Sequence, residues 1–126
     1  MSRVVRERIE PKKLVLKRYR GDKSYIIAGS ETEIKHGQVM AMKSTDGKLY
    51  AYNEDGTEGL NIPIGVYTGV SKKSTNDFGG SITTFADVSK TQVIGINFET
   101  NFIAVIELQK MGTYIIEEIE GKEVNE

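Results

Sequence analysis

The sequence of 126 residues contains no cysteine and only one histidine, His36. Without cysteine there can be no disulfide and no thiolate metal site, and one histidine cannot build a zinc site of several histidines. Only two residues are proline, whereas thirteen are glycine. This balance favours tight turns between short strands over long helices. The composition therefore predicts a small β-rich domain that depends on its apolar core alone.

Long apolar runs and catalytic motifs are also missing. No run approaches the ~18 residues of a membrane span, and the first residues lack the apolar segment of a secretory signal. The sequence contains neither the phosphate-binding pattern GxxxxGK[ST] nor the dinucleotide-binding pattern GxGxxG. His36 has no spacing to Ser or Asp partners that would make it catalytic. We therefore expect no membrane contact, no cofactor and no enzymatic activity.

Two acidic clusters invite a metal-binding or catalytic interpretation. Asn53, Asp55 and Glu58 surround Gly56, but the spacing departs from the EF-hand, which places its glycine at position six and a glutamate at twelve. A solvated turn is the expected structure. The acidic residues within 117–120 lie at or just after the end of the last predicted strand. Their charges are expected to discourage edge-to-edge pairing with another sheet.

The formal net charge is only −1, but the charges are unevenly distributed. Residues 1–23 hold nine basic and three acidic residues, a net charge of +6, and the other 103 residues carry −7. A basic segment ahead of an acidic body is typical of a chain end that contacts another surface. We interpret residues 1–23 as a basic N-terminal arm, with a short helix from Ser2 to Glu10 ended by Pro11, and residues 24–126 as the β-rich domain.

Three functions of this arm are open. Its cations and Tyr19 fit phosphate contacts to nucleic acid, although three interspersed acids oppose them. A solubilising tail is the second interpretation. Docking on a protein partner is favoured, because apolar anchors and an extended edge suit strand addition and a plain tail does not need them. The residues expected to make this contact are Arg3, Val4, Val5, Arg6, Arg8, Leu14, Val15, Leu16, Lys17 and Arg18.

From Tyr25 onward the apolar residues recur with period two. Two alternating runs, Gln38–Lys43 and Lys48–Tyr52, flank the pair Asp46-Gly47, which is a strong hairpin signal. In the second run, side chains 49 and 51 share one face and side chains 50 and 52 the other. A small antiparallel β-barrel or sandwich-like domain is the expected fold.

Further along, strands and one exposed loop are predicted by the same alternation. The segment Phe102–Ile106 is apolar on both faces, which predicts a central strand covered on both sides. No convincing helical stripe is visible. The predicted elements are the strand Ile64–Val70, the loop Ser71–Gly80, and the strands Ser81–Phe85, Gln92–Phe98, Phe102–Leu108 and Thr113–Ile119.

The order of these turns and strands resembles the lambda-type bacteriophage head decoration proteins. In that family a strand of the form G-x-v-L/M-a leads through a short turn to g-K-l-v-a/p-y/w-d/n, an acidic glycine-containing loop and a small-residue strand. Here the matching parts are Gly37–Lys43, Asp46–Asn53, Glu54–Gly59 and Ile64–Val66, and Ile103–Glu107 with Gly112–Tyr114 is similar to the closing strands. The likeness covers roughly residues 25–70 and 91–120. The loop Ser71–Gly80 has no counterpart, and the arm is more basic than the family's arm.

The resemblance implies a structural protein of the virion rather than an enzyme. It implies a β-clip-like domain that forms a homotrimer on the outer surface of an expanded capsid, assembled in the host cytoplasm, with the extended arm lying over the major capsid protein. No direct contact with nucleic acid or membrane is implied. The alternatives are a small nucleic-acid-binding β-barrel that uses the basic arm, and a phage tail or baseplate connector.

Overall fold

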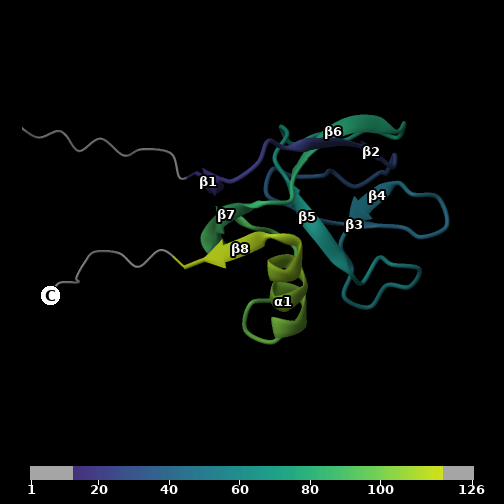
Figure 1. Cartoon of the computed structure of the whole chain (residues 1–126). Helices are drawn as coiled ribbons and strands as arrows, with labels where there is room; N and C mark the ends of the chain where they lie inside the picture. Colours follow the sequence, from purple (N-terminus) through teal and green to yellow (C-terminus); the bar gives the residue numbers. More distant parts are fainter. Residues whose placement is uncertain (1–12, 118–126) are drawn as a thin grey trace, which may run out of the picture.

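The computed structural model describes residues 13–117, which form a mainly β domain (Figure 1). Five strands close into a barrel in the order β2-β4-β3-β5-β6, and three more form a sheet in the order β1-β7-β8. The strands are β1 (Val15–Arg18), β2 (Lys23–Ile27), β3 (Val39–Met42), β4 (Leu49–Ala51), β5 (Pro63–Tyr67), β6 (Phe78–Thr83), β7 (Ala86–Ser89) and β8 (Thr113–Ile116); a 3-10 turn η2 (Lys90–Gln92) and one helix α1 (Phe102–Met111) complete the elements.

Each of the five barrel strands contributes one large, fully covered side chain to the barrel interior. Every one of these side chains is at most 2% exposed, so together they fill the centre of the barrel. They are Ile27, Met40, Leu49, Tyr67 and Ile82. The predicted β-barrel is therefore confirmed.

The predicted hairpin is also confirmed. Strands β3 and β4 pair antiparallel, with Met42 opposite Leu49 and Met40 opposite Ala51. Gly47 has a φ of 73°, a left-handed conformation that a residue without a side chain adopts readily. The Asp46 carboxylate accepts a hydrogen bond from the backbone N–H of Lys48 at 2.9 Å, so the turn is closed by its own residues.

A second apolar cluster joins the barrel to the three-stranded sheet. It uses the side chains that alternate with the barrel interior: Val39 on β3 and Val66 on β5 face outward, toward Val88 on β7 and Leu108 on α1. All four are fully buried. The strict two-residue period of the strands therefore serves two cores, one inside the barrel and one between the barrel and the sheet.

Part of the predicted arm belongs to the domain. Strand β1 pairs antiparallel with β7, with Val15 opposite Val88 and Arg18 opposite Ala86. Leu14 is 4% exposed and packs in the second cluster, and its carbonyl accepts a hydrogen bond from the N–H of Ser89 at 2.8 Å. The interpretation of residues 13–23 as an unpacked arm is therefore wrong. The expected helix at residues 2–10 lies outside the described residues.

The segment predicted as a central strand is a helix. Helix α1 begins after Asn101, whose side chain accepts the N–H of Ala104 at 3.1 Å, and it ends at Gly112, which has a φ of 102°. Only Ala104 and Leu108 on it are buried, whereas Phe102 is 60% and Ile103 72% exposed. The run also satisfies the pattern of a strand that is apolar on both faces, because this helix carries apolar side chains on its solvent side as well as on its core side.

Two other boundaries also differ from the expectation. The segment Gln92–Phe98 is not a strand; it follows the turn η2 and makes a single bridge between Ile94 and Gln38. The loop predicted for Ser71–Gly80 is shorter, because β6 already begins at Phe78. In β6, Gly80 lets the strand pass close to Ile27, since a Cβ on Gly80 would collide with that side chain.

The burial of Leu14 leads to a stability prediction. Leu14→Ala removes a side chain from the second cluster and should lower the free energy of unfolding by about 2–4 kcal/mol. Leu16→Ala is the matched control, because Leu16 is 37% exposed and should cost well under 1 kcal/mol by the same measurement. Urea denaturation followed by circular dichroism measures both. Equal stability of the two variants would contradict the packing of Leu14.

Candidate functional site

Strand β1 and the residues after it carry a row of alternating cations and rings. The ammonium of Lys17 lies 5.3 Å from the centre of the Tyr19 ring, and the guanidinium of Arg20 lies 5.0 Å from the centre of Phe85. The two rings are 5.4 Å apart at an angle of 43°. We call Lys17, Tyr19, Phe85 and Arg20 the cation–aromatic row. Cation–π contacts hold both charges at set places on an exposed surface.

The row is anchored to the sheet by hydrogen bonds of Tyr19. Its backbone N–H donates to the carbonyl of Phe85 at 3.0 Å, and its hydroxyl donates to the Asp87 carboxylate at 3.1 Å. That hydrogen bond raises the pKa of the Tyr19 phenol, which stays a neutral donor. Within the described residues, Lys17 and Arg20 form no ion pair, so both charges can meet an anionic partner.

Asp22 joins the end of β1 to the barrel. Arg18 donates to both of its carboxylate oxygens, at 2.9 and 3.0 Å. One of these oxygens also accepts the Thr68 hydroxyl at 2.7 Å and the Ser81 hydroxyl at 3.3 Å. The side chain of Asp22 is only 15% exposed. The Arg18 hydrogen bonds, supported by both hydroxyls, lower the pKa of Asp22 to about 2.

The structure distributes the predicted contact residues over different environments. Leu14 is buried, Val15 is half-buried in β1, and Leu16 and Lys17 are exposed. Arg18 is exposed but bound to Asp22. The other predicted residues, Arg3, Val4, Val5, Arg6 and Arg8, lie outside the described residues.

Helix α1 presents a second exposed surface, of apolar character. Phe102, Ile103 and Ile106 fall within about 100° of the helix circumference and are 60%, 72% and 49% exposed. We call these three side chains the outer apolar face. Sequence reasoning missed it, although the capping asparagine at 101 and the glycine at 112 flank the helix and signal its two ends.

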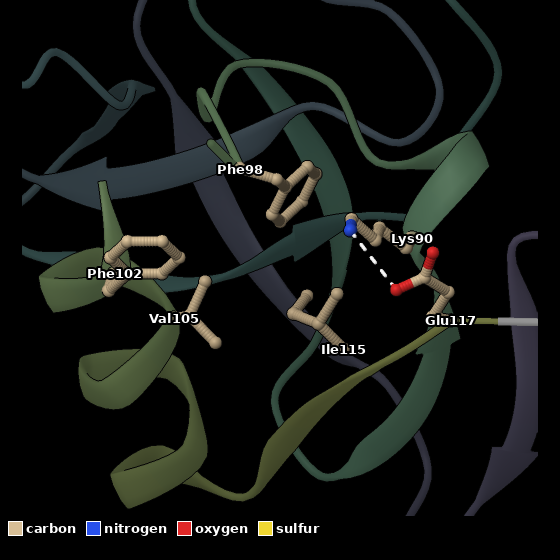
Figure 2. Close-up of a pocket in the computed structure, with 6 residues that line it drawn as sticks. All are labelled: Lys90, Phe98, Phe102, Val105, Ile115 and Glu117. Atoms are coloured by element: carbon tan, nitrogen blue, oxygen red, sulfur yellow. Dashed lines mark hydrogen bonds and ion pairs between the residues drawn. The ribbon is translucent and has the colours of Figure 1, made fainter. Parts of the chain in front are cut away.

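Beside this face lies a small pocket between α1, β8 and the segment that precedes the helix (Figure 2). It has a volume of about 180 Å³. Figure 2 shows Phe98, Phe102, Val105 and Ile115 around it. On its rim, the ammonium of Lys90 pairs with the Glu117 carboxylate at 3.3 Å, so the pocket is apolar with a neutralised edge.

The side chains that invited a chemical interpretation make local contacts. His36 is exposed, and its Nδ1 lies 2.9 Å from the Gly69 carbonyl oxygen. Asn53 accepts the backbone N–H of Asp55 at 3.0 Å, as in a turn. Glu58 instead accepts the Thr45 hydroxyl at 3.2 Å and lies 3.8 Å from Lys43. No group of three or more His, Asp or Glu side chains arranged for a metal ion occurs among residues 13–117.

Another pocket, of about 280 Å³, lies between the segments that precede β3 and follow β4. Three of its polar side chains, Ser30, Tyr50 and Asn53, already form hydrogen bonds within the chain. Ser30 accepts the N–H of Thr32 at 3.0 Å, and the Tyr50 hydroxyl donates to Asp46 at 2.7 Å. The bond with Asp46 raises the pKa of the Tyr50 phenol. These contacts stabilise turns, and we assign no ligand to this pocket.

The lowered pKa of Asp22 leads to a pH-dependent prediction. A carboxylate with a lowered folded-state pKa contributes stability above its ordinary pKa of 3.8, and this stability is lost as the pH falls through about 2. At neutral pH, Asp22→Asn should lower the free energy of unfolding by about 1–2 kcal/mol, since Arg18 is partly solvated. The difference from the natural chain should shrink between pH 4 and pH 2.

Chemical denaturation at a series of pH values measures this effect. Asp55→Asn is the control, because Asp55 is an exposed side chain in the turn after β4. Its difference from the natural chain should stay near zero throughout the series. A constant deficit of Asp22→Asn down to pH 2 would contradict the assignment.

Helix α1, the one α-helix in the described part of the chain, is not long and apolar enough to span a membrane. No family model matches the chain. No curated protein matches it either. The likeness of residues 25–70 and 91–120 to the phage decoration proteins thus stays a prediction from the order of strands and turns. The function is inferred from the two exposed surfaces, the cation–aromatic row and the outer apolar face.

Proposed function

We propose that this chain is a structural capsid decoration protein that binds the outer surface of an expanded phage head as a homotrimer and stabilises it. The partner is the major capsid protein. The contact uses residues 1–12, whose net charge is positive, together with the exposed side of β1. In this proposal the chain has no catalytic role, and its localisation is the surface of the virion.

The observation that carries this proposal is the cation–aromatic row. It extends the basic character of residues 1–12 onto a rigid strand, because Lys17 and Arg20 are held over rings rather than left free in solvent. In the described part of the chain β1 has only β7 as a partner, so its second edge is open. An open basic edge suits an acidic protein surface that offers an extended segment.

Nucleic acid is the alternative partner that the same surface favours. A small barrel with cations beside rings has the elements of a single-strand platform. However, Lys17 already lies over the Tyr19 ring and Arg20 over the Phe85 ring, so part of each ring is covered and less of it is open for a base to stack on. Protein docking with apolar anchors should survive moderate salt, whereas phosphate binding should fall steeply.

Removal of residues 1–12 tests the proposal. Purified full-length and truncated chains are mixed with expanded, undecorated heads built from the major capsid protein of the same phage, and bound protein is measured after sedimentation. The truncated chain should bind at least about a hundredfold more weakly, because three tethered contacts are lost together. The truncation must stop before Leu14, since removal of that residue would damage the core.

A charge reversal tests the row separately. The double variant Lys17→Glu, Arg20→Glu should lose roughly tenfold in affinity for heads. Lys73→Glu is the matched control, because Lys73 is an exposed lysine in the loop between β5 and β6. Undiminished binding of the truncated chain would refute the arm contact. If no version binds heads but the full chain retards single-stranded DNA, the nucleic-acid alternative holds.

A further inference from the structure

Seven of the ten side chains of helix α1 are apolar, and they lie on its solvent side as well as on its core side. Ala104 and Leu108 face the core, and the outer apolar face points away from it. Polar side chains on the helix are confined to Glu107, Gln109 and Lys110. An amphipathic surface helix carries mainly polar side chains on its solvent side, whereas here three large apolar side chains share that side. The exposed side of α1 is therefore expected to be covered in the working form of the protein.

The outer apolar face combines a projecting side chain with an adjacent hollow. Ile103 is the most exposed apolar side chain of the helix, at 72%. Its neighbour Phe102 forms a wall of the 180 Å³ pocket, together with Val105 and Ile115. The pocket is comparable with the ~150 Å³ cavity that accepts a benzene ring, so it has room for one apolar side chain.

The charges around this surface indicate what kind of partner covers it. Glu107 pairs with Lys110 at 3.6 Å, and Glu117 pairs with Lys90 at 3.3 Å. These four charges are thus matched in pairs within the same chain. A strongly charged partner would leave one sign unmatched, whereas a second copy of this chain presents both signs in equal number.

We infer that α1 is the surface through which copies of this chain associate: Ile103 of one copy enters the pocket lined by Phe98, Phe102, Val105 and Ile115 of the next. This inference rests on the trimer of the proposed function and assigns the surface between its subunits. Each copy offers one projecting side chain and one pocket, and in the proposed trimer the projection of each copy fills the pocket of the next, head-to-tail. Three such contacts close a ring.

Ile103→Glu tests this contact, with mass measured by light scattering after gel filtration over a concentration series. The natural chain should show the mass of three copies. The variant should be monomeric at the same concentrations, with an association at least about a hundredfold weaker, because the pocket cannot solvate a carboxylate. The matched control is Val70→Glu, which replaces an apolar side chain that is 80% exposed elsewhere; it should remain trimeric.

Val105→Phe tests the pocket from the other side, by filling it without adding a charge. It should also weaken the trimer, and thermal unfolding verifies that the variant is folded.

A monomeric or dimeric natural chain, or a trimer that survives Ile103→Glu, would overturn the inference. Head binding is measured independently: if the natural chain forms the trimer but binds no heads, the proposed function fails and the contact stands. If Ile103→Glu remains a trimer and binds heads in a manner that depends on residues 1–12, the contact through α1 fails and the proposed function stands.

Discussion

The apolar cluster between the barrel and the three-stranded sheet holds the functional surfaces in place. Val39 and Val66 enter it from the outside of the barrel, Leu14 from the start of β1, and Leu108 from α1. Neither β1 nor α1 belongs to the barrel, so both depend on this cluster for their position. The cation–aromatic row and the outer apolar face are thus attached to the same core. The row begins on β1, at one edge of the sheet β1-β7-β8, and α1 lies beside β8 at the other edge (Figure 1).

The barrel was predictable because its strands obey a local rule. The alternation around Asp46-Gly47 predicts a hairpin without knowledge of any distant residue, and β3 and β4 form one. The alternation also separates Met40, inside the barrel, from Val39, in the second cluster. The two-residue alternation shows that both faces of β3 are apolar, but it does not show which face packs against a helix.

The two surfaces were harder to predict because they depend on contacts between distant residues. Strand β1 is held by pairing with β7, about seventy residues later, and nothing local in its basic sequence indicates this partner. Helix α1 lacks an amphipathic stripe, since its outer side is apolar as well. Its caps were the better signal: Asn101 before the apolar run and Gly112 after it mark a helix of ten residues.

Separation of the two surfaces has a physical consequence for assembly. Adjacent strands lie roughly 4.8 Å apart, so β1 and β8 are about 10 Å from one another across β7. A ring closed through α1 would leave the cation–aromatic row of each copy exposed. The copy–copy contact would be apolar and hold at high salt, whereas the row would act through charges that salt screens. Three rows on one ring would bind together, so a weak charged contact in each copy becomes a strong one in the assembly. The charge that opposes association of free copies is thus kept away from the surface that joins them.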